Sequence, residues 1–287
     1  MTLPWKLSVT ASGLTSADLE RAPSLFREAG IDRIEGGWRF HPEPNLKAFA
    51  ATGKRFKEAG IRLDSFHLPF GPAYDLSHFY ETHRGRAVSE LCDWITAVSA
   101  AGAPLCIIHP GAIDADVQLE GLDRFLDAIC RSLETLADAA AANQIQLAVE
   151  NLPPRPDSER FGALPEHFSA LSQRFQHPNV GFCLDTGHAH MMVGAERIAG
   201  MFDAMGERLI AFHLADNAGD RDAHLAPGRG LVDWDLVFTR AHQLGFTGTM
   251  CIETPPFAPG PHYTPQAWRQ LVDDTAQLAG ECLASTP

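Results

Sequence analysis

Short apolar runs alternate with longer stretches of mixed polarity along the whole chain. Runs of this kind are typical of buried strands, whereas stretches with apolar positions three or four residues apart are typical of helices. Eight runs are predicted strands: Lys6–Thr10, Arg33–Gly36, Arg62–His67, Leu105–His109, Gln146–Glu150, Val180–Asp185, Leu209–His213 and Thr249–Glu253. The clearest predicted helices are Ser16–Ala29, Glu81–Ala101, Leu122–Ala142, Pro165–Phe175 and Pro265–Leu278.

The order of these elements predicts the fold class. Eight strands that alternate with helices indicate an α/β protein built as a single (β/α)8 TIM barrel. Residues 1–287 contain no linker, low-complexity tract or shift in composition, so one domain is expected. A doubly wound open sheet is the alternative, although no G-x-G-x-x-G motif follows the first predicted strand. Gly30, Gly60 and Gly102 each precede a strand, where a left-handed residue commonly ends the preceding helix.

The charge of the chain argues against a nucleic-acid partner. Its 287 residues include 23 Lys and Arg and 36 Asp and Glu, which gives a net charge of −13. A field of this sign repels phosphate backbones, and the basic residues form no patch along the sequence. The expected partner is therefore a small molecule, and association into a homo-oligomer stays open.

Three features favour a cytoplasmic protein without a membrane span. Trp94–Ile113 is uncharged, but its Gly and Pro residues fit a helix followed by a strand better than a membrane helix. Met1–Thr10 has no apolar stretch of the kind found in signal peptides. Because no C-x-x-C pair is present, free thiols in a reducing compartment are predicted for Cys92, Cys106, Cys130, Cys183, Cys251 and Cys282.

Residue types that bind metal ions occur at the ends of successive predicted strands. The runs SFHLPFG, CIIHPG, LAVENLPP, GFCLDTGH, IAFHLADN and MCIETPPF supply His67, His109, Glu150, Asp185, His213 and Glu253, and the earlier run RIEGG supplies Glu35. In a (β/α)8 barrel these positions converge at the C-terminal mouth, where active sites form. Carboxylates gathered in one pocket repel each other unless a cation neutralises them. The sequence therefore predicts a divalent-metal site at this mouth.

Two segments after these strands supply further candidate ligands. The sequence DTGHAH places His188 three residues after Asp185, near the start of a helix. The loop ADNAGDRDAHLAPGRG contains Asp216, Asp222 and His224, and the D-x-H spacing puts its two side chains on one side of an extended chain. The alternative is that this loop is merely solvated. Histidines without a comparable context are interpreted as surface or core residues: His41, His78, His83, His177 and His190.

Together these motifs resemble the xylose-isomerase-like TIM barrels. This family includes sugar-phosphate isomerases and epimerases, hydroxypyruvate isomerases, inosose dehydratases and zinc-dependent apurinic-site endonucleases. The resemblance extends from about Leu7 to Leu278. It rests on PGRGLVDW and on five strand-end motifs: HPG at His109, ENLP at Glu150, LDTGH at Asp185, HLADN at His213 and IETP at Glu253.

The resemblance implies two different sets of metal ligands. Similarity to the ketose epimerases implies one divalent ion, Mn²⁺, Zn²⁺ or Co²⁺, held by Glu150, Asp185, His213 and Glu253. Similarity to the endonucleases implies up to three zinc ions, whose ligands match His67, His109, Glu150, Asp185, His188, His213, Asp222, His224 and Glu253. One ion is the expectation here, with His67, His109 and His188 binding substrate. The larger set stays open because a shared fold does not decide the chemistry.

The predicted function is that of a metal-dependent isomerase or epimerase of a small sugar, sugar phosphate or keto-polyol. Removal of a proton beside a carbonyl gives an enediolate, whose negative charge a divalent ion stabilises. Glu150 and Glu253 are the predicted catalytic pair, one removing a proton and the other returning it.

Other functions are compatible with the same residues. The full ligand set suits a zinc-dependent hydrolase, such as a phosphoesterase with a di- or trinuclear site, although the net charge argues against DNA as substrate. A metal-dependent dehydratase would use the same residues as the isomerase, and a sugar-binding barrel would leave the ligands without a purpose. Glu35, Trp38 and Phe70 are candidate pocket residues. Four arginines of the mouth loops could bind phosphate: Arg155, Arg160, Arg221 and Arg229.

Overall fold

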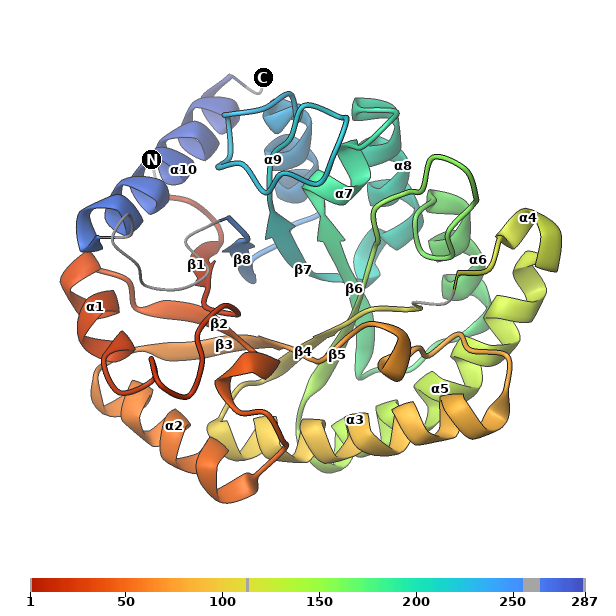
Figure 1. Cartoon of the computed structure of the whole chain (residues 1–287). Helices are drawn as coiled ribbons and strands as arrows, with labels where there is room; N and C mark the ends of the chain where they lie inside the picture. The colour runs from red at the N-terminus through yellow and green to blue at the C-terminus, as the bar shows by residue number, and fades with distance from the viewer. Residues whose placement is uncertain (1, 112–113, 255–263, 286–287) are drawn as a thin grey trace.

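The computed structural model of the chain describes residues 2–111, 114–254 and 264–285. They form a closed barrel of eight parallel strands, in which each strand pairs with the next and β8 pairs with β1 (Figure 1). The strands are β1 (Lys6–Thr10), β2 (Arg33–Gly37), β3 (Arg62–His67), β4 (Leu105–Ile108), β5 (Gln146–Glu150), β6 (Val180–Asp185), β7 (Leu209–Leu214) and β8 (Thr249–Ile252). The predicted single (β/α)8 barrel is confirmed.

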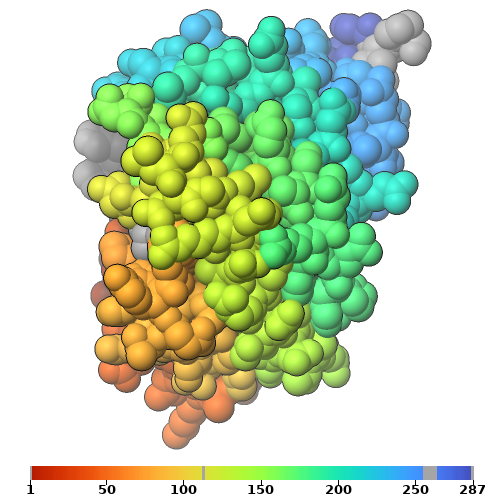
Figure 2. All heavy atoms as spheres, turned by 90° about the vertical axis from the view of Figure 1, so that its right-hand side faces the viewer, coloured from red at the N-terminus to blue at the C-terminus, as the bar shows by residue number. Residues whose placement is uncertain are grey.

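Helices follow the strands and surround the barrel (Figure 1). They are α1 (Ala22–Ala29), α2 (Leu46–Glu58), α3 (Glu81–Ala101), α4 (Val117–Glu120), α5 (Leu122–Ala142), α6 (Pro165–Arg174), α7 (Thr186–His190), α8 (Ala195–Met205), α9 (Trp234–Gln243) and α10 (Pro265–Ala284), with short 3-10 turns η1 (Trp38–Phe40), η2 (Pro72–Tyr74) and η3 (Gly206–Arg208). Seen from the side in Figure 2, the yellow-green atoms of α4 and α5 lie between the orange atoms of α3 and the green atoms of α6 and α8. The outer helices therefore pack side by side in chain order.

The predicted strands match the observed ones to within one residue at each end. The prediction of a helix from Ser16 is wrong, because α1 begins at Ala22 and Pro23 occupies its first turn. A proline lacks the N–H that a helix interior needs and clashes with the preceding turn, so it is placed at a helix start. At the other end of the chain, α10 continues beyond the predicted end to Ala284.

Large aromatic side chains fill the space between the strands and the helices. Trp5 is 2% exposed. The phenylalanines with less than 2% exposure are Phe26, Phe40, Phe49, Phe56, Phe66, Phe125, Phe168, Phe182, Phe202, Phe212 and Phe238. Close packing of such rings leaves the strands little freedom to shift. The strand ends are therefore rigid supports for side chains at the mouth of the barrel.

A layer of small apolar side chains lies within the barrel, beneath the candidate ligands. It contains one buried residue from each of four neighbouring strands: Ile107, Ala148, Cys183 and Ala211. Each comes two positions before a candidate ligand on or directly after the same strand: His109, Glu150, Asp185 and His213. Because residues two apart in a strand face the same side, the ligands rest on this apolar layer.

Two further expectations concern thiols and membranes. All six cysteines are free thiols, as predicted; four are buried, whereas Cys92 and Cys130 are half-buried. Within the described ranges, no helix combines the length and the apolar character needed to cross a membrane. Pro255, the last residue of the IETP motif, lies outside the described residues.

Candidate metal centre and active site

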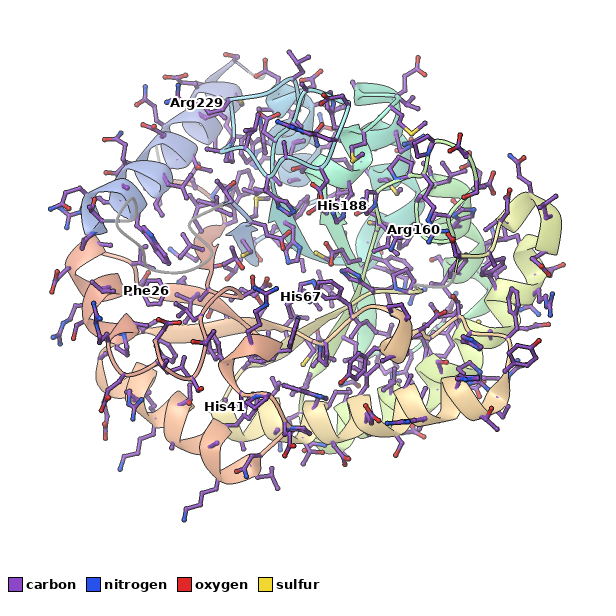
Figure 3. The ribbon with its side chains drawn as sticks, in the orientation of Figure 1. Phe26, His41, His67, Arg160, His188 and Arg229 are labelled. Atoms are coloured by element: carbon purple, nitrogen blue, oxygen red, sulfur yellow. The ribbon has the colours of Figure 1, made fainter. Side chains whose placement is uncertain are left out.

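Side chains able to bind metal ions gather at the C-terminal end of the barrel in three groups. Within each group, one ligand atom from every residue lies within 4.8 Å of the others. The first group is His67, His109 and Glu150; the second is Glu150, Asp185, His213 and Glu253; the third is His188, Asp222 and His224. All nine ligands that the family resemblance implies thus belong to a group, and Glu150 belongs to two, whereas Glu35 and Asp216 belong to none. Figure 3 shows His67 and His188 at the opening of the barrel.

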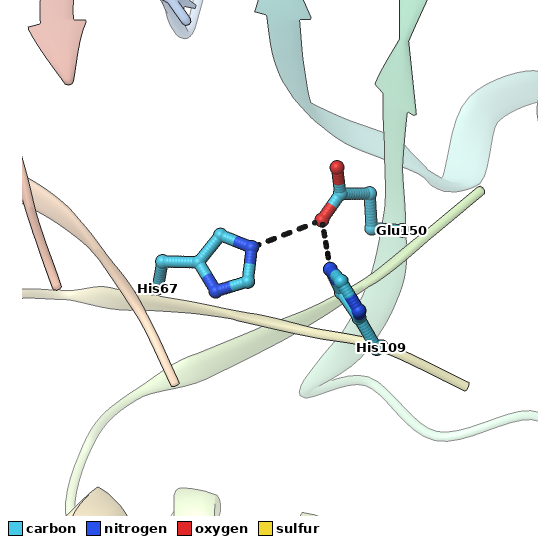
Figure 4. A group of neighbouring side chains, drawn as sticks. All are labelled: His67, His109 and Glu150. Atoms are coloured by element: carbon cyan, nitrogen blue, oxygen red, sulfur yellow. Dashed lines mark ion pairs between the residues drawn. The ribbon is translucent and has the colours of Figure 1, made fainter. Parts of the chain in front are cut away.

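The first group converges on one oxygen of Glu150. The Oε2 atom of Glu150 lies 3.2 Å from Nε2 of His67 and 3.2 Å from Nε2 of His109 (Figure 4). His67 is the last residue of β3, His109 directly follows β4, and Glu150 ends β5. The three strand ends therefore point two ring nitrogens and one carboxylate at a common position.

The second group surrounds Nδ1 of His213. This nitrogen lies 3.0 Å from Oε1 of Glu150, 3.1 Å from Oε2 of Glu253 and 3.9 Å from Oδ2 of Asp185. Asp185 and His213 are fully buried, at 0% exposure. Three carboxylates around one imidazole form the oxygen-rich donor set that suits divalent ions such as Mn²⁺ and Zn²⁺.

The third group lies where α7 meets the loop between β7 and α9. Asp185 caps α7, because its Oδ1 accepts a hydrogen bond of 2.6 Å from the backbone N–H of His188. This cap fixes the position of His188. Oδ2 of Asp222 lies 3.2 Å from Nε2 of both His188 and His224. His224 has a φ of 44°, a left-handed conformation that is unfavourable for a residue with a side chain.

Backbone carbonyls set which ring nitrogen faces each candidate ion position. The Nδ1 atoms of three histidines lie 2.9, 2.8 and 2.9 Å from carbonyl oxygens, in the pairs His67–Leu68, His188–Asn151 and His224–Glu253. A carbonyl only accepts hydrogen bonds, so each Nδ1 carries a hydrogen and each Nε2 presents a lone pair when the ring is neutral. Each of these Nε2 atoms lies 3.2 Å from a carboxylate oxygen. Because the lone pairs would repel, a proton or a metal ion has to lie between the two atoms.

Several carboxylate oxygens of these groups have no hydrogen-bond donor. Within the described part of the chain, Oδ2 of Asp185 and Oδ1 of Asp222 are buried without a hydrogen bond. Oε2 of Glu150 and Oε2 of Glu253 have only ring nitrogens nearby, at 3.1–3.2 Å, and no regular hydrogen bond. An unpaired charged oxygen away from water is costly, and coordination to a cation would offset this cost. The donor set, the oriented nitrogens and these unsatisfied oxygens together fit divalent ions.

The proton affinities of the metal-free groups reflect this crowding of charge. Burial lowers the pKa of His188, but the Asp185 carboxylate and the hydrogen bond to Asp222 outweigh it and raise the pKa to about 10. Burial likewise lowers the pKa of His224, while Asp222 and the Glu253 carboxylate raise it to about 9. Burial raises the pKa of Asp185 to about 7 against the opposing charge of His188. Without a metal ion, both histidines therefore hold protons at neutral pH.

A cavity of about 390 Å³ opens above the three groups. Its volume lies within the range of small-molecule sites. Seven of the candidate ligands line it: His67, His109, Glu150, His188, Asp222, His224 and Glu253. Trp38 and Phe70 also line it, as expected from the sequence. A molecule in the cavity would therefore contact the two glutamates of the second group, whereas Asp185 and His213 lie below, sealed from solvent.

Glu35 occupies a different place from the other strand-end residues. It is 1% exposed and lies within β2, two residues before the end of the strand. Its Oε2 accepts a hydrogen bond of 2.7 Å from Oγ of Ser65 and lies 3.2 Å from Nε2 of His213. Glu35 is thus a neighbour of the second group and contacts a candidate ligand rather than the cavity.

Asp216 holds the loop after β7 in place rather than joining the ligand groups. Its carboxylate is 0% exposed and accepts four hydrogen bonds of 2.9–3.0 Å. The donors are the backbone N–H groups of Asn217, Gly228 and Val232 and the indole N–H of Trp234. These bonds also explain the PGRG sequence, because a Cβ at Gly230 would lie 2.3 Å from Oδ1 of Asp216.

The candidate arginines separate into different environments. Arg155 pairs with Asp114 at 2.9 Å, and Arg229 pairs with Asp274 at 3.5 Å. Arg221 is exposed on the loop after β7. Arg160 lines the cavity. Sequence position alone gave no reason to separate Arg160 from the others.

Asn151 is a site residue that the sequence reasoning missed. Its side-chain Oδ1 accepts a hydrogen bond of 2.7 Å from the backbone N–H of Asp185, and its Nδ2 donates one of 3.0 Å to the Asp185 carbonyl. Its own carbonyl accepts from Nδ1 of His188. Asn151 therefore fixes the ends of β5 and β6 relative to each other. Its place directly after Glu150 in the ENLP motif was the available signal.

Comparison with known proteins identifies a matching family and a curated relative. A family model described as a xylose isomerase-like TIM barrel matches residues 24–276. Among curated proteins, the uncharacterized protein y4fM of Sinorhizobium fredii is 26% identical over 256 residues, which cover 80% of this chain and 79% of that protein.

Solved structures share the fold over nearly the whole chain. A D-tagatose 3-epimerase-like protein superposes with a TM-score of 0.79 at 20% identity and covers 97% of this chain and 99% of its own. The IOLI protein, solved with a bound zinc atom, superposes with a TM-score of 0.77 at 18% identity and covers 96% of this chain and 98% of its own. At these identities the likeness shows the fold.

Proposed function

This chain belongs to the xylose isomerase-like TIM barrel family, and we propose that it is a divalent-metal-dependent isomerase or epimerase of a small carbohydrate. The reaction would proceed by proton transfer at a carbon beside a carbonyl, through an enediolate. The D-tagatose 3-epimerase-like protein that shares this fold supports a ketose-like substrate.

The observation that carries the proposal is the second group of residues. Glu150, Asp185 and Glu253 place carboxylate oxygens around Nδ1 of His213, and one oxygen of each carboxylate lacks a hydrogen bond among the described residues. A bound divalent ion would supply Lewis-acid stabilisation of negative charge that develops on the substrate oxygens. Mn²⁺, Zn²⁺ and Co²⁺ all accept such ligands.

Glu253 and Glu150 are the proposed acid and base. Both line the cavity, at 9% and 1% exposure, so both can reach a bound molecule. Burial raises the pKa of Glu253, but the neighbouring His213 outweighs it and lowers that pKa to about 2, so the side chain is an ionised carboxylate at neutral pH. Its Oε2 faces His213, which leaves Oε1 as the atom to receive the proton. Glu150, once protonated, would return a proton to the substrate carbon, and exchange with solvent would restore both carboxyl groups to their starting states.

His67, His109 and His188 are the proposed substrate-binding residues when a single ion is present. All three line the cavity, and ring nitrogens of this kind can donate to or accept from substrate hydroxyls. His224 and Asp222, in the loop after β7, would then contact the substrate as well.

A second candidate is a zinc-dependent hydrolase. One observation favours it. His67 and His109 form a group that shares Glu150 with the four-residue group, and His188, Asp222 and His224 form a third group. Adjacent ions in such groups would activate water and stabilise an oxyanion. The net charge of −13 disfavours a nucleic-acid substrate and leaves a small ester.

The two candidates differ in metal content and in product. We would load the protein with Mn²⁺ or Zn²⁺, count the metal by elemental analysis, and incubate it with ketopentoses, ketohexoses and their phosphates. New epimers detected by NMR with about one ion per chain would support the isomerase. Hydrolysis of phosphate esters with about three zinc ions per chain would support the hydrolase. Asp185→Asn should lower metal content and activity together, and full metal occupancy in that variant would contradict the assignment.

A further inference from the structure

Arg160 differs from the other arginines of the mouth loops by lining the cavity without a carboxylate partner. It lies in the connection between β5 and α6, and it lines the cavity together with His188 (Figure 3). In the described part of the chain it forms no ion pair within 4.0 Å, whereas Arg155 and Arg229 each contact an aspartate. Arg160 and Arg39 are thus the two guanidinium groups that line the cavity, and Arg160 is the more buried of the two.

The hydrogen-bond donors of Arg160 are largely unused. Its Nη1 donates to the carbonyl of Pro153 at 3.5 Å, the outer limit of a hydrogen bond. Its Nε is buried and has no partner among the described residues. A guanidinium carries five N–H donors in a planar fork, which matches the oxygen pairs of carboxylates and phosphates. Because Nε is sealed from solvent, an oxyanion in the cavity would meet the Nη donors of Arg160.

The charges around Arg160 also favour an oxyanion at this position. Burial and the charge of Arg155 lower the pKa of Arg160, and the charges of Glu150 and Asp75 oppose this only in part. A guanidinium stays protonated in proteins, so the cation at this position is short of stabilising negative charge. Arg39 adds a second positive charge on the same cavity, stacked 5.3 Å from the ring centre of Trp38.

We propose that the substrate carries an oxyanion, a carboxylate or a phosphate, which Arg160 binds in the wall of the cavity. The substrate would then be an acidic sugar derivative, with its anionic end on Arg160 and its reacting carbons beside Glu150 and Glu253. This inference rests on the proposed function for the position of the reacting carbons. The oxyanion site itself rests on the contacts of Arg160.

The test compares affinities for matched neutral and anionic compounds. Mn²⁺-loaded protein is titrated calorimetrically with D-fructose and D-fructose 6-phosphate, and separately with sorbitol and D-gluconate. Charge-assisted hydrogen bonds predict that the anion of at least one pair binds about ten-fold or more tightly than its neutral partner. A preference in the first pair identifies a phosphate, and a preference in the second identifies a carboxylate.

Variants separate binding by Arg160 from binding by the metal ion. Arg160→Gln should remove most of the preference, and Arg160→Lys, which keeps the charge but not the planar fork, should retain part of it. Arg229→Gln, which removes a rim arginine outside the cavity, should leave the preference unchanged. Metal content measured on each variant controls for loss of the ion.

Two results would overturn the inference. One is equal affinity for both members of both pairs, or no measurable binding of either anion. The other is a preference that persists in Arg160→Gln. Failure of the proposed function has a different signature, because it would leave the anion preference intact while no ketose is epimerised.

Discussion

The Nε2 atom of His213 lies 3.2 Å from Oε2 of Glu35, inside the barrel and beneath the candidate metal ligands. A carboxylate accepts hydrogen bonds, so Glu35 holds the hydrogen of His213 on Nε2 and leaves the lone pair on Nδ1. Nδ1 is the atom that faces Glu150 and Glu253. Glu35 is therefore a positioning residue, of the kind that commonly orients a metal-binding histidine.

Glu35→Gln should weaken metal binding without changing the fold. The amide keeps the size of the side chain but removes the negative charge that stabilises the Nε2–H form of His213. We expect the dissociation constant for Mn²⁺ or Zn²⁺ to rise about 10–100-fold, measured by competition with a chelator. Ser65→Ala, which removes only the hydrogen bond to Glu35, should have a smaller effect. An unchanged affinity in Glu35→Gln would show that this contact does not orient His213.

Binding of a second ion, by the third group, should release protons at neutral pH. In the metal-free protein the pKa values of His188 and His224 are about 10 and about 9, because nearby carboxylates stabilise the charged rings. Both rings are thus protonated at pH 7, and an ion that binds their Nε2 atoms must displace those protons. The affinity for a second ion should therefore rise as the pH increases from 7 toward 9. Titrations in buffers of different protonation enthalpy measure the protons released, and a value of zero would contradict this expectation.

His224→Ala should tell whether the third group holds an ion of its own. If His188, Asp222 and His224 bind zinc, this variant should lose about one equivalent of metal per chain. If the group binds only substrate, the metal content should stay constant while KM rises. His83→Ala, on the exposed surface of α3, is the matched control and should change neither quantity.

Asp216→Ala should destabilise the fold. Four hydrogen-bond donors converge on this buried carboxylate, and removing it leaves them without an acceptor. We expect the free energy of unfolding to fall by about 3 kcal/mol or more, measured by chemical denaturation. Asp220→Ala, an exposed position of the same loop, should change it by less than about 0.5 kcal/mol. Equal stability of the two variants would mean that the loop does not depend on Asp216.

The strand ends were predictable because two signals coincide there. Each apolar run stops at a residue such as Glu150 or Asp185, which cannot be buried without a partner. The end of the apolar run and the position of the candidate ligand therefore both indicate where the strand ends. The start of α1 was not predictable from composition alone, since residues from Ser16 onward include helix formers, and the position of Pro23 decided the outcome.

The candidate ligands were predictable from the sequence, but the residues that hold the ligands and their loop in place were not. The convergence of His67, His109 and Glu150 follows from barrel topology, which brings all strand ends to one face. The contact between Glu35 and His213 joins residues 178 positions apart in sequence, and no local pattern indicates it. The same holds for Asp216, whose role became clear only from the four donors that surround it.

Exchange of a carbon-bound hydrogen with solvent tests the central claim most directly. Metal-loaded protein is incubated in D₂O with a panel of ketopentoses, ketohexoses and their phosphates, and deuterium is followed by NMR at the carbon beside the carbonyl. The account predicts that the epimerised sugar gains deuterium there, and that Glu253→Gln, which keeps the size of the side chain but not its basicity, abolishes the exchange. Epimerisation without deuterium, or release of phosphate without exchange at carbon, would contradict it.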